Sequence, residues 1–154
     1  MASHSRTDKD YKPNNDYYTP AWIFEKLNTK FDLDVCAPIG GTGLVPAARH
    51  YSLVDDGLVS PWEGVVWMNP PFSAPTPWID KFIEHDNGIC LVAMSRSKAF
   101  MRLWNQADAL VALPNNLSFV LPDGKKKDIF MPCILAAMGD ENVRALHNLE
   151  ERVR

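Results

Sequence analysis

One short stretch of the chain limits its fold more than any other. The apolar run at residues 65–68 is followed at once by Asn69, Pro70 and Pro71. An apolar run of this length next to turn residues is typical of a buried strand. Proline has a fixed φ and no N–H, and the residue before a proline favours extended backbone, so the strand cannot continue past Asn69. The sequence therefore predicts a buried strand that ends in a rigidly held amide.

Segments with strand and helix patterns alternate along most of the chain. We expect strands at residues 31–37, 65–68, 89–94 and 109–113, and helices at residues 20–27, 47–51, 76–85, 98–106 and 141–153. Thr19 is a good N-cap for the first helix, and Pro20 suits its first position. The continuous apolar strands favour burial on both faces. The pattern therefore predicts an α/β fold with a mainly parallel, doubly wound sheet.

The two sides of this sheet are expected to differ. Between the first strand and the strand at 65–68 there are only 28 residues, 37–64. This is too short for two further strand–helix units, because one βαβ unit takes about 30 residues, so the sheet should be truncated and partly replaced by loop. Near the C-terminus, residues 117–121 and 129–138 read as strands joined by the turn at 122–128. They predict an antiparallel hairpin at the other end of the sheet.

Length and composition favour one folded unit. With 154 residues, 46% of them hydrophobic, the chain suits a single domain, which we expect at 16–154 after a flexible polar N-terminus at 1–15. No stretch is long and apolar enough for a membrane span, and the N-terminus is too polar for a signal peptide, so a cytoplasmic location is expected. Cys36, Cys90 and Cys133 lie far apart in apolar runs and are expected to be buried free thiols. Neither the cysteines nor the histidines show metal-ligand spacing, so no metal site is predicted.

The residues after the buried strand have a definite chemistry. In parallel sheets ligands bind beyond the carboxyl ends of the strands, which is where Asn69 is expected. The Asn69 side-chain oxygen and the Pro70 backbone oxygen could both accept hydrogen bonds, and two fixed acceptors suit a planar amino group. Phe72 could stack on the ring that carries this group. The pattern therefore favours an aryl amine or an amide nitrogen as the nucleophile.

These residues also carry a family resemblance. Asn-Pro-Pro-Phe at 69–72 is similar to the [DNS]-P-P-[YFW] catalytic motif of S-adenosylmethionine-dependent amino methyltransferases. D-x-Y-T-P near the start, F-D-L-D-V-C-A, D-G-L-x-x-x-W and V-W-M-N-P-P-F-S together resemble the compact phage-type DNA N6-adenine methyltransferases, the Dam-like family. The resemblance covers residues 16–138. It implies a compact, truncated class I methyltransferase fold of Rossmann-like type, with S-adenosyl-L-methionine as cofactor and DNA as partner.

The resemblance also implies a role for each matching residue. The catalytic loop that grips adenine N6 would be Asn69, Pro70, Pro71 and Phe72. The cofactor-binding residues would be Tyr18, Thr19 and Pro20, then Asp34, Cys36 and Ala37 at the end of the first strand, with Asp55 or Asp56 for the ribose or adenine. Two of these have structural alternatives: Thr19 and Pro20 could be only a helix cap, and Asp55 and Asp56 only a turn. The chain lacks the F-x-G-x-G pattern of larger methyltransferases.

Basic residues gather in two places despite a net charge of −3. Lys125, Lys126 and Lys127 lie in the expected hairpin turn, whereas Arg96 lies just before the helix expected at 98–106 and Lys98 begins it. In a DNA methyltransferase they are candidates for phosphate contacts, and otherwise the three lysines are a solvated turn.

Other functions fit the same motif. The paired acceptors could also grip cytosine N4 or a protein glutamine amide, and a catalytically silent DNA-binding or anti-restriction relative could retain the fold. A homodimer is possible. The sequence does not reveal the DNA target.

Overall fold

The computed structural model describes residues 17–41, 43–114, 117–129 and 131–149. The predicted N-terminal segment 1–15 and the last residues of the predicted C-terminal helix lie outside them. Eight strands are formed: β1 Phe31–Asp34, β2 Ala47–His50, β3 Val66–Met68, β4 Gly88–Ala93, β5 Ala109–Ala112, β6 Ser118–Val120, β7 Lys126–Asp128 and β8 Cys133–Met138. The helices are α1 Ala21–Leu27, α2 Thr76–His85, α3 Lys98–Gln106 and α4 Asp140–His147.

Six strands form one mixed sheet in the order β2-β1-β3-β4-β8-β5. β1 pairs in parallel with β2 and β3, and β3 in parallel with β4, whereas β8 is antiparallel to both β4 and β5. β6 and β7 form a separate antiparallel pair. The α/β class and the antiparallel character of one end of the sheet are therefore as predicted. No described strand lies beyond β2, which agrees with the expected truncation.

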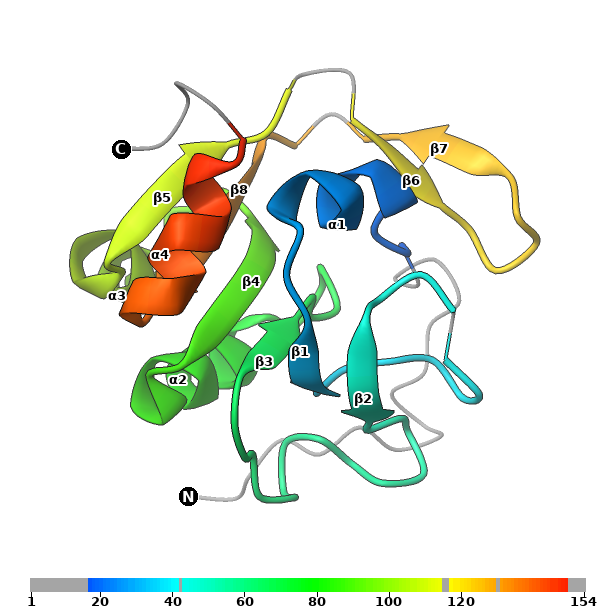
Figure 1. Ribbon diagram of the computed structural model, residues 1–154, viewed down its shortest axis with the longest axis horizontal. Helices are drawn as coiled ribbons and strands as arrows, with labels where there is room; N and C mark the ends of the chain where they lie inside the picture. The colour runs from blue at the N-terminus through cyan, green and yellow to red at the C-terminus, as the bar shows by residue number, and fades with distance from the viewer. Residues whose placement is uncertain (1–16, 42, 115–116, 130, 150–154) are drawn as a thin grey trace.

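Helices cover both faces of the sheet, as a doubly wound fold requires. On one face, α2 and α3 bury Trp78, Phe82, Phe100 and other side chains against strand residues such as Met68. On the other face, α1 and α4 form a second core around Trp67. Figure 1 shows α1 and α4 together on the near face. The continuous apolar strands are explained by this burial on both faces, since β4 and β8 are almost fully buried.

The predicted helix at residues 47–51 is wrong, because this segment forms strand β2. Its register places Ala47 beside Phe31 and His50 beside Asp34. Three of the four residues of β2 are exposed. The segment therefore has no buried apolar pattern from which a strand could be predicted. Its conformation is decided by the open edge of β1, whose Phe31 N–H donates to the Pro46 carbonyl. Tertiary pairing thus overrides local helix propensity.

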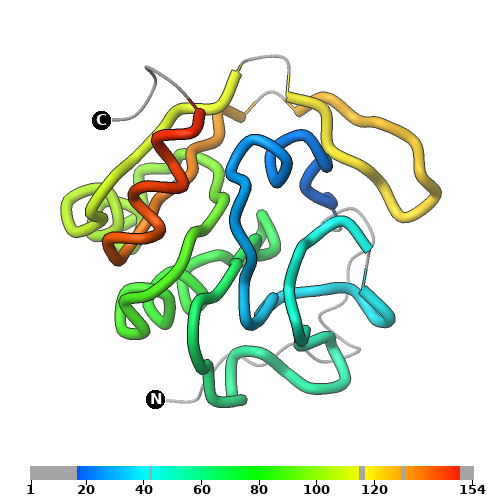
Figure 2. The backbone as a smooth tube through the Cα atoms, in the orientation of Figure 1, coloured from blue at the N-terminus to red at the C-terminus, as the bar shows by residue number. Residues whose placement is uncertain are grey.

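The predicted C-terminal hairpin is wrong in its pairing. The partner of β6 is β7, which contains Lys126 and Lys127, so two of the three lysines lie in a strand rather than in the turn. β8 begins after Pro132 and lies inside the main sheet between β4 and β5. Proline has no N–H to donate to a strand ladder. Pro132 therefore divides the strand predicted at 129–138, and β8 begins only after it. The hairpin projects beside the start of α1 (Figure 2).

Thr19 does not cap α1, contrary to the prediction. The N-cap position is Pro20, and no side chain caps this helix. Ser97, by comparison, caps α3 by accepting a hydrogen bond from the Phe100 N–H at 3.1 Å. The Thr19 side chain is buried and takes part in the site described below.

The predicted burial of the thiols holds for two of the three cysteines, and all three are free. Cys90 and Cys133 are buried in β4 and β8, and burial raises the pKa of the Cys133 thiol to about 12. Cys36 is only half-buried. No helix among the described residues is long and apolar enough to cross a membrane.

Candidate active site

The carboxyl ends of β1 and β3 lie side by side, and the site is built there. Asp34 is in register with Trp67, and the Val35 N–H donates to the Trp67 carbonyl at 3.1 Å. From β1 the chain runs first to β2 on one side and then to β3 on the other. This is the topological switch point at which open α/β sheets bind ligands. Asp34 and Asn69 therefore end neighbouring strands at the same edge of the sheet.

The amide of Asn69 has one settled orientation. Its Nδ2 donates to the Tyr17 carbonyl oxygen at 3.0 Å and to Thr19 Oγ1 at 3.1 Å. A carbonyl oxygen only accepts hydrogen bonds, so the nitrogen must face Tyr17. The opposite atom, Asn69 Oδ1, is buried and has no hydrogen-bond partner among the described residues. A buried acceptor without a hydrogen bond lowers the stability of the folded protein by about 1–3 kcal/mol. The N–H group of a ligand would supply the missing hydrogen bond.

Three aromatic rings form a cluster at the other end of the loop 69–72. Phe72 stacks on Tyr17 with ring centroids 5.0 Å apart and an angle of 23° between the planes. Phe119 of β6 meets Phe72 edge to face at 5.7 Å and contacts Tyr17 at 6.0 Å. The segment before α1, the loop after β3 and the hairpin thus converge on one cluster.

The end of β1 provides a buried carboxyl group. The Asp34 side chain is only 6% exposed, and its Oδ1 accepts a hydrogen bond from the Cys36 N–H at 3.3 Å. Burial raises the pKa of this carboxyl to about 7, although the Cys36 bond acts in the opposite direction. A cationic ligand group beside Asp34 would favour the ionised form. Ala37 continues the edge, with its N–H donating to the Tyr51 carbonyl at 2.8 Å.

The loop after β2 holds Asp55 and Asp56. Asp55 Oδ2 accepts hydrogen bonds from the Ser52 N–H at 2.9 Å and from its hydroxyl at 3.3 Å, so this carboxylate closes the turn 52–55. Asp56 has a positive φ of 56°, and its Oδ1 accepts from the Leu58 N–H at 3.2 Å. Both side chains have local structural partners. These local hydrogen bonds are the ones that the turn alternative expects for both residues.

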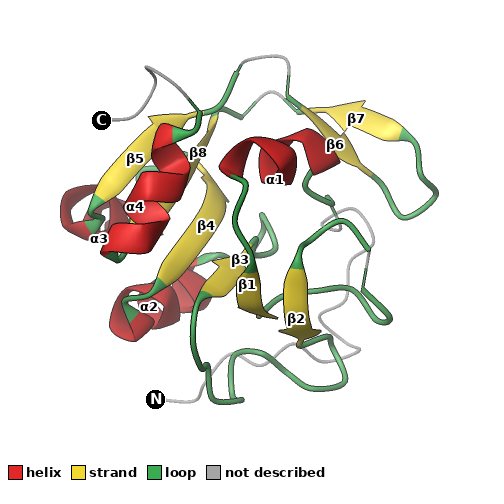
Figure 3. Ribbon diagram, in the orientation of Figure 1, coloured by secondary structure: helices red, strands yellow, loops and turns green. Residues whose placement is uncertain are grey.

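Gly57 explains how this loop reaches the end of β1. A Cβ atom at Gly57 would lie 2.0 Å from the Val35 carbonyl oxygen, so only glycine allows this approach. The Gly57 carbonyl accepts from Trp62 Nε1 at 2.7 Å and from Lys81 Nζ at 3.1 Å. Lys81 also donates to the carbonyls of Leu58 and Ser60. The Asp-Gly-Leu and Trp of the sequence motif thus have a structural role. Figure 3 shows how much of this part of the fold is loop.

The predicted DNA-contacting residues belong to two exposed segments, the β6–β7 hairpin and the turn that leads from β4 into the first residue of α3. Lys125, Lys126 and Lys127 are exposed on the β6–β7 hairpin, and Lys127 is in register with Phe119, whose ring contacts Phe72. Arg96 and Lys98 are exposed after β4. The hairpin thus places basic side chains close to the site despite the acidic net charge.

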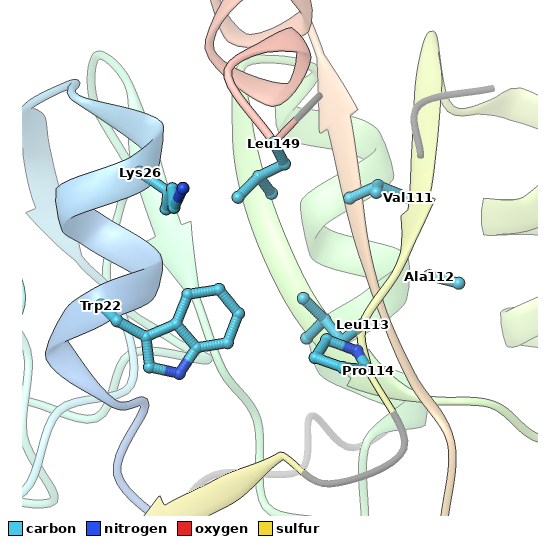
Figure 4. A pocket seen from close by; sticks show the side chains of 7 residues that line it. All are labelled: Trp22, Lys26, Val111, Ala112, Leu113, Pro114 and Leu149. Atoms are coloured by element: carbon cyan, nitrogen blue, oxygen red, sulfur yellow. The ribbon is translucent and has the colours of Figure 1, made fainter. Parts of the chain in front are cut away.

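The pocket in Figure 4 lies elsewhere. It has a volume of about 280 Å³ and is bounded by Trp22 and Lys26 of α1, the end of β5, and Leu149. Its side chains are apolar apart from one lysine, so they offer no pair of acceptors for an amino group. No residue of the predicted site lines it. Among the described residues, no group of three or more histidines, cysteines and acidic residues could hold a metal.

Comparison with known proteins decides the family. The family model described as DNA N-6-adenine-methyltransferase (Dam) matches residues 4–129. The chain belongs to this family. The match to the Dam family includes every predicted site residue and ends before β8, so it covers the candidate site but not the last strand and helix.

A curated relative has the same description as the family model. The DNA N-6-adenine-methyltransferase of Haemophilus phage HP1 (strain HP1c1) is 34% identical over 89 residues, which cover 54% of this chain and 49% of the relative. The chain thus spans about half the length of the curated relative that it matches.

Two residues of the site were missed by sequence reasoning. Tyr17 lies next to the predicted Tyr18 in an aromatic pair before Thr19-Pro20, and Phe119 lies in an apolar run that reads as an ordinary strand. The Tyr-Tyr pair was a usable signal for Tyr17. Nothing in the local sequence indicates that Phe119 contacts Phe72, because 46 residues separate the two positions and the contact depends on where the hairpin packs.

Proposed function

We propose that this protein transfers a methyl group from S-adenosyl-L-methionine to the N6 amino group of adenine in DNA. The observation that carries the proposal is the Asn69 amide, whose nitrogen is held by Tyr17 and Thr19 while its buried oxygen has no described partner. The oxygen is thereby left to accept a hydrogen bond from a substrate amino group. Family membership supports adenine as the carrier of that group.

The Pro70 carbonyl is the second acceptor. It belongs to a stretch without helix or strand, and no described residue donates a hydrogen bond to it. Two acceptors on one amino group direct its lone pair away from the ring and towards an electrophile. S-adenosyl-L-methionine, when bound, supplies a methyl group on a sulfonium centre. Phe72 orients the adenine ring, and the proton leaves N6 to solvent after transfer.

The residues at the end of β1 fit this cofactor. Asp34 is a buried carboxyl group one strand away from Asn69, and a cationic ligand would stabilise its ionised form. We assign Asp34, Cys36 and Ala37 to the amino-acid part of the cofactor. We assign Tyr18, Thr19 and Pro20, which lie directly before α1, to the same part of the cofactor, and Asp55 or Asp56 to its ribose or adenine.

DNA is the proposed partner, and the target adenine must leave the base stack. An amino group inside a duplex cannot reach the buried oxygen of Asn69. The exposed lysines of the hairpin, with Arg96 and Lys98, contact phosphates around the extruded nucleotide.

The decisive test is product analysis. Plasmid DNA incubated with the protein and S-adenosyl-L-methionine is digested to nucleosides and analysed by mass spectrometry. We expect N6-methyladenine; N4-methylcytosine alone, or methylglutamine in added protein, would replace the proposal by one of its rivals. Calorimetric titration with the cofactor separates an enzyme from a silent relative, for which no heat of binding is expected.

Asn69→Ala tests the catalytic assignment. We expect cofactor affinity to be unchanged and methyl transfer to fall by about 100-fold or more, which is the usual loss when one preorganised polar contact to the reacting group is removed. Calorimetry and a filter assay with labelled cofactor measure the two effects. Asn142→Ala is the comparison variant, because it removes another buried amide, one that is hydrogen-bonded to Asn87 and Met138 and to no described residue of the candidate site. Retained transfer by Asn69→Ala would remove this residue from the catalytic role.

A further inference from the structure

The ring of Tyr17 lies where a base stacked on Phe72 would lie. Its centroid is 5.0 Å from that of Phe72, and the two planes are nearly parallel. A base between two rings would hold them about 7 Å apart, twice the contact distance of stacked carbon atoms. Tyr17 and an extruded base therefore cannot share this face of Phe72 in the arrangement observed.

Of the three rings in the cluster, Tyr17 is the one that can leave. Phe119 is completely buried in β6, and Phe72 follows two prolines. The Tyr17 and Phe72 side chains are both half-buried, and of these two only Phe72 follows a backbone fixed by prolines.

The backbone around Tyr17 is held in place. The Tyr18 N–H donates to the Val120 carbonyl at 2.7 Å, and the Val120 N–H donates to the Tyr18 carbonyl at 2.9 Å. The Tyr17 carbonyl accepts from Asn69. Rotation of the Tyr17 side chain would therefore clear Phe72 without disturbing the amide that grips the substrate.

We propose that Tyr17 is a place-holder for the target base: its ring covers Phe72 in the substrate-free protein, and the entering adenine displaces it. This inference rests on the proposed function, because it assumes that Phe72 stacks the adenine. Tyr17 thereby keeps the apolar face of Phe72 out of water and at the same time positions Asn69 through its carbonyl oxygen.

The size of the effect follows from the stacking energy. Aromatic pairs of this kind contribute an energy that corresponds to roughly two- to tenfold in an equilibrium constant. The apparent affinity for the base equals the intrinsic affinity multiplied by the fraction of molecules in which Phe72 is free. Removal of the ring should therefore raise the affinity for an already extruded adenine by about two- to tenfold.

Single-stranded probes test this without knowledge of the DNA target. The first is a short fluorescein-labelled oligothymidylate with one central deoxyadenosine, and the second carries an abasic site at that position. Anisotropy titrations give the ratio of the two affinities. We expect this ratio to rise about two- to tenfold in Tyr17→Ala, to stay at the wild-type value in Tyr17→Phe, and to approach one in Phe72→Ala.

The other outcomes are equally clear. An unchanged or lower ratio in Tyr17→Ala overturns the inference, because the ring would then support the site rather than occupy it. If circular dichroism shows that Tyr17→Ala is unfolded, Tyr17→Leu takes its place, since leucine keeps apolar cover without a planar ring and should also raise the ratio. Methyl transfer by the wild-type protein is measured separately. If the wild type does not transfer methyl groups but the affinity ratio rises in Tyr17→Ala, only the proposed function is refuted. If the wild type transfers methyl groups but the ratio is unchanged in Tyr17→Ala, only the place-holder role is refuted.

Discussion

At the scale of single residues, the site depends on how one amide is turned. An asparagine can present its oxygen or its nitrogen to a substrate, and here the neighbours decide. The Tyr17 carbonyl and the Thr19 hydroxyl take both hydrogen bonds from Nδ2, and Oδ1, which has no partner among the described residues, is the atom that we propose accepts from the substrate. Thr19, expected as a helix cap, instead holds the Asn69 side chain, and we propose that it is a positioning residue for Asn69.

Thr19→Val should separate this role from cofactor binding. Valine keeps the shape and the backbone but loses the hydroxyl, so the Asn69 amide keeps one of its two holding bonds. We expect kcat to fall about tenfold, in line with the loss of one hydrogen bond, while the KM for the cofactor is unchanged. Steady-state kinetics measure both, and Thr19→Ser should restore kcat. A rise in KM with an unchanged kcat would instead place Thr19 against the cofactor.

At the scale of elements, the β6–β7 hairpin joins the proposed DNA contacts to the loop 69–72, which we propose is catalytic. Phe119 touches Phe72, Val120 pairs with Tyr18, and their strand partners are Lys127 and Lys126. The hairpin therefore supports the aromatic cluster with one strand and presents positive charge with the other.

Replacement of Lys125, Lys126 and Lys127 by glutamine should weaken DNA binding most at low salt. Each lost phosphate contact lowers the slope of log K against log salt by about 0.9, so the slope should fall by up to about 3. Fluorescence anisotropy at several salt concentrations measures it. Glutamine at the exposed Lys26, Lys30 and Arg144 is the control with the same charge change. Equal slopes for the wild type and the hairpin variant would exclude these lysines from phosphate contact.

The loop after β2 is held by close packing at Gly57. In Gly57→Ala the new methyl group would overlap the Val35 carbonyl oxygen, so the loop must move away from the end of β1. We expect a loss of more than about 2 kcal/mol in the free energy of unfolding, measured by urea titration. Gly40→Ala is the comparison, because φ is +82° there and nothing lies within 4 Å of the added atom. Backbone strain alone should cost this control about 1–2 kcal/mol, and an equal loss in both variants would exclude the steric explanation.

At the scale of the whole molecule, the buried Asp34 links folding to pH. Its pKa is raised from 3.8 to about 7 by burial, so the folded protein binds a proton that the unfolded chain releases near pH 4. The associated stability is complete below about pH 4 and is lost as pH rises through 7, by up to about 4 kcal/mol.

Comparison of the wild type with Asp34→Asn isolates this contribution. Urea midpoints at pH 5 and pH 8 should differ more in the wild type than in the variant, with the lower stability at pH 8. S-adenosyl-L-methionine should reduce the difference, because a cationic group beside Asp34 favours the ionised form. The same pH dependence in both proteins would show that Asp34 is not the group responsible.

The sequence by itself determined the parts of this protein that depend on neighbouring residues. Pro70 and Pro71 end a buried strand whatever the fold around it, and the spacing of Trp78, Ile79, Phe82 and Ile83 suffices to place α2 at residues 76–85. The alternation of such segments established the α/β class, and the motifs at 34–37 and 69–72 indicated the family.

The tertiary structure decided what depends on partners far along the chain. Residues 47–50 became a strand because β1 offers an open edge, and β8 entered the main sheet while the lysines paired with β6. Tyr17 reached Phe72, and Thr19 reached Asn69, across about 50 residues of sequence. Local patterns encode propensity and burial, whereas these pairings depend on which backbone edges and faces are left open once the core has packed.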